Sequence, residues 1–171
     1  MIKRFHQDLQ RNVYELFIGE YLALREKDVY LTTVLGPCIA VCLADKKAGV
    51  VGMNHFMLPG ASGGDDARYG LDSMNKLLGD LTRQGANHSD LTARVFGGAN
   101  VYKVSNNIAD SNIAFIEAFL KQQRIPVEAS DLGDKCGRRL YFCSSTYTVQ
   151  LKRFGQNCCP DLVNQNTITF S

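Results

Sequence analysis

Cysteine and histidine are the residue types in this chain that could perform covalent chemistry together. Cys38, Cys42 and His55 all lie within the segment YLTTVLGPCIAVCLADKKAGVVGMNHFMLPG, which spans residues 30–60. A free thiol has a pKa of about 8.5 and is mostly protonated at neutral pH. An adjacent imidazole that accepts its proton gives a thiolate–imidazolium pair, an activated nucleophile. Two interpretations follow: Cys38 and His55 form a nucleophilic site, or they are packing residues of a hairpin.

The elements that would position these two side chains form a predicted antiparallel hairpin. The runs IAVCLAD and GVVGMNHFML flank the polar turn DKKAG, which suits such a hairpin. If the turn is centred between Lys46 and Lys47, the numbers of paired residues sum to 93 and Cys38 lies opposite His55. Directly opposed residues share a face with Cβ atoms about 4.5–5.5 Å apart. The thiol and the imidazole would then be within hydrogen-bond reach, unless a bulge or slip changes the register.

A nucleophile–base pair also needs a third group to orient the imidazole. The candidates near His55 in the sequence are Thr32, Thr33 and Asn54, although Asn54 would point to the opposite face of its strand. Cys42 would face Val51 in the same register and is interpreted as a small apolar core residue. The other two histidines, in the N-terminal segment and in the loop GANHSD, have no cysteine placed against them.

The remaining elements are indicated by hydrophobic periodicity. Strands are predicted for GEYLAL, VYLTTVL, IAVCLA, GVVGMNHFML, ARVFGGA, PVEASDL, RRLYFCSS and TVQLKRF. Helices are predicted around the stripe Leu71, Met74, Leu78 and Leu81 and the stripe Ile113, Ile116, Phe119 and Leu120. Asp110 or Ser111 could cap the second helix, which ends before Pro126. The order predicts an α+β fold with two helices on a mostly antiparallel sheet and some strands packed on other strands.

Composition narrows the class of protein. A length of 171 residues fits a single domain, here residues 1–171. The 19 basic and 17 acidic residues are mixed along the chain, so a nucleic-acid partner is not predicted. The pairs Arg138-Arg139 and Lys152-Arg153 are interpreted as solvated. The Gly-rich, acidic loop PGASGGDDARYG is expected to be mobile and exposed.

The sequence also indicates a compartment and a redox state. The N-terminal region resembles no signal-peptide core, and no run approaches the roughly 18 apolar residues of a membrane span. The protein is therefore expected in the cytoplasm, not embedded in a membrane, with its six cysteines reduced. None of them forms a C-x-x-C pair, and neither a metal site nor a cofactor is predicted. The vicinal pair Cys158-Cys159 is interpreted as incidental.

Four motifs in order resemble those of the chemoreceptor glutamine deamidase family, CheD. They are TTVLGPCIAVCLAD, GMNHFMLPG, RVFGGAN and DLGDKCGRRLYF, and the interval from Cys38 to His55 is also the family's. The resemblance covers about residues 19–154, with an N-terminal extension expected to fray and a C-terminal tail that matches no motif. It implies a three-layer α/β/β sandwich, similar to the catalytic domain of cytotoxic necrotizing factor toxins.

By this resemblance, Cys38 is the nucleophile, His55 the general base and acid, and Thr32 the third member. The implied activity is cytoplasmic deamidation of glutamines in the helical region of methyl-accepting chemoreceptors, with methylester hydrolysis as a related reaction. The alternative it implies is an adaptor that binds and regulates a CheC-type response-regulator phosphatase. A cysteine peptidase and a thiol redox sensor are rival interpretations of the same residues.

Two positions depart from the family's pattern. Pro37 stands where the family most often has serine, and proline offers no backbone N–H to an oxyanion. Asp134 stands where the family commonly has a second glycine, so this departure bears on the conformation of the turn more than on the reacting groups.

Overall fold

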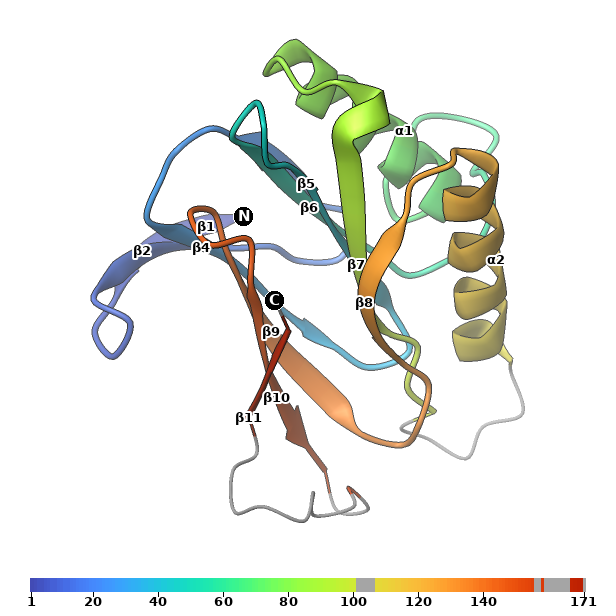
Figure 1. The fold of residues 1–171 in the computed structure, drawn as a ribbon. Coiled ribbons are helices and arrows are strands. Elements are labelled where there is room, and N and C mark those ends of the chain that lie inside the picture. Colours follow the sequence, from blue (N-terminus) through green and yellow to red (C-terminus); the bar gives the residue numbers. More distant parts are fainter. Residues whose placement is uncertain (101–106, 156–157, 159–166, 171) are drawn as a thin grey trace.

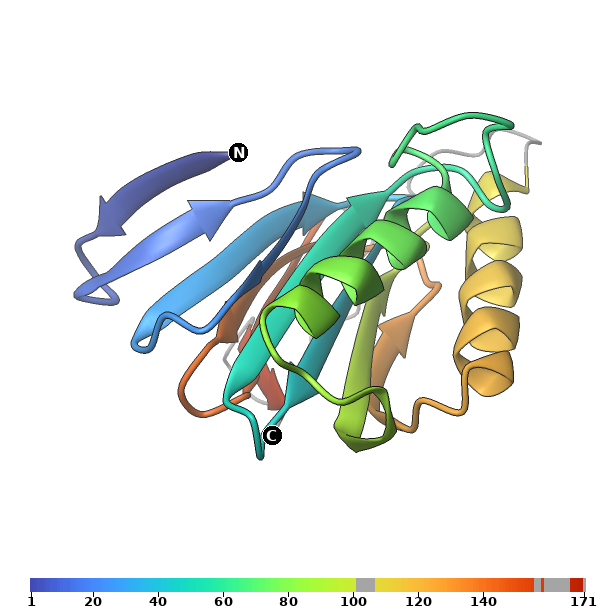
Figure 2. The same ribbon diagram turned by 90° about the horizontal axis from the view of Figure 1, so that it is seen from above.

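Two stacked β-sheets and two helices make up the structure, a computed structural model that describes residues 1–100, 107–155, 158 and 167–170. The six-stranded sheet has the order β1 (Ile2–His6), β2 (Arg11–Glu15), β4 (Val29–Leu35), β9 (Gly137–Cys143), β10 (Val149–Phe154), β11 (Thr167–Phe170). The five-stranded sheet has the order β3 (Tyr21–Leu24), β6 (Val50–Phe56), β5 (Ile39–Asp45), β7 (Leu91–Gly97), β8 (Val127–Leu132). Helices α1 (Gly70–Arg83) and α2 (Ile108–Gln122) cover the outer face of the five-stranded sheet (Figures 1 and 2).

This arrangement confirms the α+β sandwich expected from the sequence. All strand pairs are antiparallel except β2 with β4 and β7 with β8. The eight predicted strands correspond to β3 to β10. The N-terminal extension does not fray as expected, because β1 and β2 form a hairpin that joins the six-stranded sheet beside β4.

Strand β5 is the centre of the fold because both of its faces are buried. Its larger residues, Ile39, Val41 and Leu43, point toward the helices, and the small residues that alternate with them point toward the other sheet. Small side chains on that face allow the two sheets to approach closely. Two cores result, one between helices and sheet and the other between the sheets.

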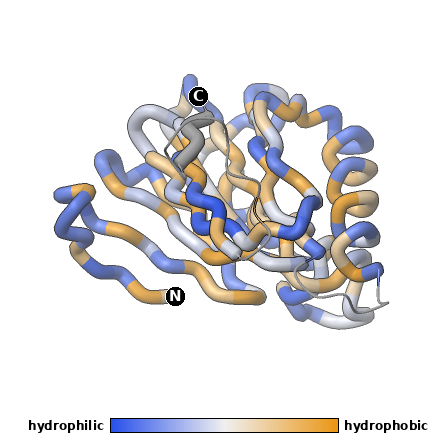
Figure 3. Tube along the Cα trace, turned by 90° about the horizontal axis from the view of Figure 1, so that it is seen from below, coloured by the Kyte–Doolittle hydropathy of each residue, from blue (hydrophilic) through white to orange (hydrophobic). Residues whose placement is uncertain are grey.

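Both predicted helices are present, and each turns an apolar face to the sheet. In α1, Met74, Leu77 and Leu81 are buried, while in α2 the buried apolar set includes Ile116 and Leu120. In Figure 3, hydrophobic and hydrophilic residues alternate around α2, the helix at the right of the view. The predicted caps of α2 are wrong by about one turn. The helix begins at Ile108, so that Asp110 and Ser111 lie inside its first turn.

The β5–β6 hairpin forms with a register that differs from the prediction by two residues. Asp45 pairs with Val50, so paired numbers sum to 95 and the turn has four residues instead of two. The carboxylate of Asp45 accepts hydrogen bonds from the backbone N–H groups of Lys47 and Ala48, which stabilises the longer turn. Its other oxygen accepts from the N–H of Asn87, a contact with a distant segment that the hairpin sequence does not reveal.

Arg138 is fully buried, contrary to the prediction that the pair Arg138-Arg139 is solvated. Its guanidinium donates two hydrogen bonds to one carboxylate oxygen of Asp131, and Arg153 donates to the other oxygen. Asp131 lies on β8 and Arg138 on β9. The ion pair therefore ties one sheet to the other.

A disulfide joins Cys136 to Cys158, so the expectation that all cysteines are reduced is wrong for this pair. Strand β10 runs antiparallel to β9 until Phe154 pairs with Gly137. Cys136 directly precedes Gly137, and Cys158 follows Phe154 by four residues. The Cα atoms of Cys136 and Cys158 are 5.2 Å apart. Cys159 lies outside the described residues, and Cys38, Cys42 and Cys143 are free thiols. No helix in the described part of the chain is long and apolar enough to cross a membrane.

Candidate active site

Cys38 and His55 lie on the same face of the five-stranded sheet, the face that packs against the other sheet. His55 pairs with Ala40 on β5, and Cys38 lies two residues before Ala40, in the bend that leads into the strand. The shift of two residues preserves the face because side chains alternate with period two. The thiol and the imidazole are thus diagonal neighbours instead of directly opposed, a relation that typically separates residues by about 7–8 Å.

The imidazole of His55 is buried and its orientation is fixed by Thr33. The hydroxyl of Thr33 donates to the Leu16 carbonyl oxygen at 2.7 Å and lies 2.8 Å from Nδ1 of His55. Because the hydroxyl has one hydrogen, and Leu16 receives it, Nδ1 must carry the proton and donate to Thr33. Nε2 is then the basic nitrogen, and it has no hydrogen-bond partner in the described part of the chain.

Thr32, the third member implied by the family resemblance, does not contact His55 in this structure. Its hydroxyl donates to the carbonyl oxygen of Leu140 on the neighbouring strand β9. Adjacent residues of a strand point to opposite faces, and it is Thr33 that shares the inter-sheet face with Leu31 and Leu35. Asn54 points to the helix side, as expected, where its amide contacts the Met74 sulfur.

Burial keeps both reactive groups uncharged. Cys38 is 5% exposed and His55 is 4% exposed. Loss of solvation raises the pKa of the Cys38 thiol to about 11 and lowers the pKa of His55 to about 4. At neutral pH these shifts favour a thiol and a neutral imidazole over the thiolate–imidazolium pair in the free protein.

The glycine pair of the RVFGGAN motif holds the backbone of Cys38. The N–H of Gly98 donates to the Cys38 carbonyl oxygen at 2.8 Å, and the N–H of Ala99 donates to the Gly36 carbonyl oxygen at 2.8 Å. Gly97 has φ +117°, and a Cβ at this position would overlap the carbonyl group of Cys38. The sequence predicts a tight bend or a close backbone approach at these two glycines, and the structure shows that the segment approached is that of Cys38.

Backbone hydrogen bonds also connect the motif RVFGGAN to the motif DLGDKCGRRLYF. The N–H of Gly133 donates to the Gly97 carbonyl oxygen, and the N–H of Asn100 donates to the Asp134 carbonyl oxygen. Asp134, which replaces the glycine common in the family, adopts φ +64°. Aspartate tolerates this left-handed conformation better than most side chains do. The turn is therefore retained despite the departure.

A groove of about 360 Å³ opens beside His55, where the segment that follows β2 passes the end of β4. Its lining residues are Glu15, Leu16, Phe17, Ile18, Thr33, Val34 and His55. Phe17, Ile18 and Val34 are 47%, 44% and 39% exposed, respectively. Three apolar side chains that face solvent beside a buried imidazole are suited to contact an apolar surface of a partner.

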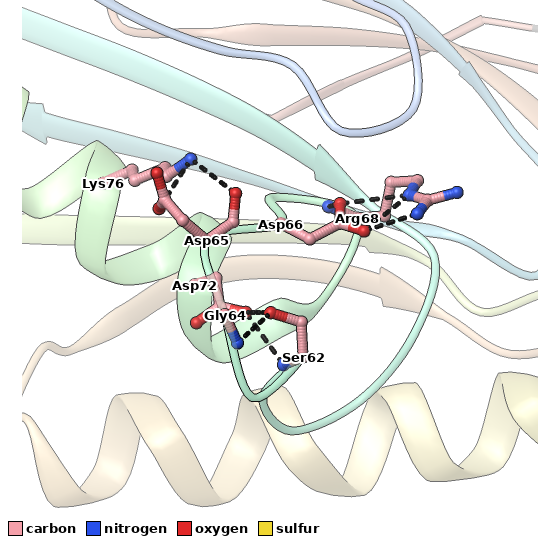
Figure 4. A network of polar contacts seen from close by, with 7 residues as sticks. All are labelled: Ser62, Gly64, Asp65, Asp66, Arg68, Asp72 and Lys76. Carbon is pink, nitrogen blue, oxygen red and sulfur yellow. Dashed lines mark hydrogen bonds and ion pairs between the residues drawn. The ribbon is translucent and has the colours of Figure 1, made fainter.

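Polar side chains of the loop between β6 and α1 contact one another and the first two turns of α1 (Figure 4). Asp72, in the first turn of α1, accepts hydrogen bonds from the backbone N–H and the hydroxyl of Ser62. Asp66 pairs with Arg68, and Asp65 pairs with Lys76. The described residues contain no group of three or more His, Cys, Asp or Glu side chains placed to hold a metal ion.

Comparison with known proteins identifies the family. A family model described as CheD chemotactic sensory transduction matches residues 57–153. The chain is 44% identical over 129 residues to the probable chemoreceptor glutamine deamidase CheD of Rhizobium johnstonii, covering 72% of this chain and 70% of that protein. It is 36% identical over 169 residues to the protein of the same name from Caulobacter vibrioides, covering 95% of this chain and 90% of that protein.

Proposed function

The chain belongs to the CheD family, and from that premise we propose that it hydrolyses the side-chain amides of specific glutamines in methyl-accepting chemoreceptors, giving glutamate and ammonia. The relatives from Rhizobium and Caulobacter are named as probable chemoreceptor glutamine deamidases. In this structure, the main support is the environment of His55. One ring nitrogen is fixed by Thr33, and the other has no hydrogen-bond partner among the described residues and lies on the sheet face that also carries Cys38.

The reaction begins when the Cys38 sulfur attacks the amide carbon of the glutamine and its proton passes to Nε2 of His55. The protonated imidazole then gives a proton to the departing ammonia, which leaves a thioester between Cys38 and the glutamyl group. Neutral His55 next removes a proton from water, which attacks the thioester and releases glutamate. Hydrolysis of a glutamyl methyl ester would follow the same steps with methanol as the leaving group.

The negative charge that develops on the amide oxygen needs backbone donors. Pro37 has no N–H, so it cannot take this role. The backbone N–H of Cys38 belongs to the residue whose sulfur attacks, and it is our candidate for one donor.

The substrate is a glutamine on an exposed helix, and the groove beside His55 suits such a partner. An amphipathic helix presents apolar side chains three or four positions from a chosen residue. Placing the target glutamine over His55 would set such a neighbour against Phe17, Ile18 and Val34. Because the receptor helices that carry these glutamines lie in the cytoplasm, we place the protein there as well.

The experiment that tests the proposal is incubation with a purified chemoreceptor cytoplasmic fragment, followed by mass spectrometry of its peptides. We expect glutamine-to-glutamate conversion by the unaltered protein and by Cys42→Ala, and none by Cys38→Ala. Cys42 is a matched control because it is a buried free thiol four residues from Cys38.

Two results would contradict the proposal. Conversion that persists in Cys38→Ala would exclude this cysteine as the nucleophile. No conversion of a folded, glutamine-bearing receptor would favour the adaptor role, and binding of a CheC-type phosphatase would then be measured.

A further inference from the structure

Asn112 on α2 connects the chain segment that carries Cys38 to the segment that carries His55. The side chain is fully buried. Its amide nitrogen Nδ2 donates to the carbonyl oxygen of Pro37 at 3.1 Å and to the carbonyl oxygen of Met57 at 2.8 Å. Pro37 is the residue before Cys38, and Met57 is two residues after His55.

The orientation of the Asn112 amide follows from its partners. Both neighbours are carbonyl oxygens, which only accept hydrogen bonds, so the group between them must be the NH₂ with its two donors. The acceptor Oδ1 of the same amide is buried without a hydrogen-bond partner among the described residues. An unpartnered buried acceptor costs free energy. Any stabilisation that the Asn112 amide gives the fold must therefore come from its two donated bonds.

The two bonds lie where the backbone ladder can no longer hold the strands together. The β5–β6 pairing ends at Ile39 and Phe56. The next pair along the hairpin would be Cys38 with Met57, but the Met57 N–H donates to the Arg68 carbonyl oxygen instead. Pro37, one residue further, has no N–H at all. Backbone bonds from Gly98 and Ala99 hold the Cys38 segment from the β7 side, and on the β6 side the Asn112 side chain bridges it to Met57.

We propose that Asn112 is a positioning residue for the reaction, which sets the distance between the Cys38 thiol and the His55 imidazole by holding Pro37 and Met57 together. This proposal rests on the Cys38–His55 site proposed above. A displacement of about 1 Å between reacting groups can reduce a rate by roughly 100-fold. Leucine in place of Asn112 preserves the volume approximately and removes both donors.

The test is a double-mutant cycle on the rate of Cys38 alkylation by iodoacetamide, in the full chain, with Asn112→Leu, His55→Ala and the combination. We expect each single substitution to slow alkylation, and Asn112→Leu to have little further effect once His55 is absent, because its effect operates through the pair. In receptor deamidation, Asn112→Leu should lower kcat by about 10- to 100-fold and leave KM within about twofold. Asn112→Ser, which retains one donor, should be intermediate and serves as the second variant if Asn112→Leu does not fold.

Ile116→Val is the matched control for helix packing, since Ile116 is a buried residue of the same helix whose side chain has no hydrogen-bonding atom. It should lower the melting temperature without changing alkylation or kcat. Equal effects of Asn112→Leu with and without His55, or a loss of kcat in Ile116→Val matching that of Asn112→Leu, would overturn the proposal. If His55→Ala does not slow alkylation in the otherwise unaltered protein, the proposed Cys38–His55 pair itself is wrong.

Discussion

The two ring nitrogens of His55 have different surroundings, and this difference assigns their roles. Nδ1 contacts the Thr33 hydroxyl, while Nε2 has no partner in the described part of the chain. A histidine that acts as a base needs one nitrogen fixed and the other available. The pair of adjacent threonines, of which only Thr33 contacts the ring, allows this assignment to be tested directly.

Thr33→Val should lower kcat for deamidation by about 10- to 100-fold, because the imidazole loses the group that selects its tautomer. Thr32→Val is the matched control, since its hydroxyl bonds Leu140 on another strand. It should retain kcat within about threefold, because a hydroxyl that contacts none of the reacting groups does not stabilise the transition state. The measurement is steady-state deamidation of a receptor fragment. A larger loss of kcat in Thr32→Val than in Thr33→Val would show that Thr32 is the residue that orients His55.

His55 should also make stability depend on pH. Its pKa is lowered by burial from 6.5 to about 4, so the unfolded chain binds this proton more readily than the folded protein does. The contribution of neutral His55 to the unfolding free energy is therefore fully present above pH 6.5 and is lost as the pH falls toward 4. At 1.36 kcal/mol per pKa unit, the loss is roughly 3 kcal/mol. Urea unfolding should show that the unfolding free energy changes less between pH 7 and pH 4 in His55→Gln than in the unaltered protein. Equal differences in both proteins would contradict the assigned burial.

At the scale of elements, the bend before β5 depends on the turn that follows β7. The chain from Gly97 to Ala99 donates two backbone hydrogen bonds to the Gly36–Cys38 segment. The chain after β8 in turn donates to Gly97. The backbone of Cys38 is therefore held by two segments that are distant in sequence, and a side chain at Gly97 would overlap it.

Gly97→Ala should abolish deamidation or prevent folding, because the new Cβ would overlap the Cys38 carbonyl group in a backbone with φ +117°. Gly63→Ala is the comparison, since Gly63 also has positive φ, at +77°, but nothing lies within 4 Å of its added Cβ. It should cost about 1 kcal/mol in unfolding free energy through backbone strain and retain activity. Thermal unfolding and deamidation assays distinguish the two. Similar behaviour of both variants would mean that close packing at Cys38 is unimportant.

At the scale of the whole molecule, the active-site face is buried between two sheets, so the attachment of one sheet to the other matters. Asp131 on β8 receives hydrogen bonds from Arg138 on β9 and Arg153 on β10. A buried carboxylate without its partners is strongly unfavourable. This ion-pair network fixes one end of the sandwich.

Arg138→Met should reduce the unfolding free energy by about 3 kcal/mol, the lower part of the range for breaking a buried pair, because Arg153 still contacts Asp131. The double variant Asp131→Leu/Arg138→Met should recover part of this loss, since the two most deeply buried charges are both removed and Arg153, whose side chain is 25% exposed, can be solvated. Arg139→Met, which removes a partly exposed pair with Glu15, should cost less than about 1 kcal/mol. Urea unfolding measures all three. A similar cost for Arg138→Met and Arg139→Met would show that the buried pair adds little.

By itself, the sequence determined the reactive residue types, their place on a hairpin, and the sandwich class. Alternation of apolar residues is a local property, and it predicted the strands that carry Cys38 and His55 and the helices α1 and α2. Face assignment was also secure, because a register error of two residues leaves both side chains on the same face.

Only the tertiary structure decided the details on which chemistry depends. The four-residue turn that goes with the observed register is stabilised by Asp45, which accepts hydrogen bonds within the turn and also from the distant Asn87. The contact of His55 with Thr33 and not with Thr32 followed from which face of β4 meets the other sheet. The burial of Arg138, the Cys136–Cys158 disulfide and the role proposed for Asn112 all depend on segments brought together across the chain. Such contacts leave no periodic signal, because they depend on the path of the whole chain instead of the preferences of a few consecutive residues.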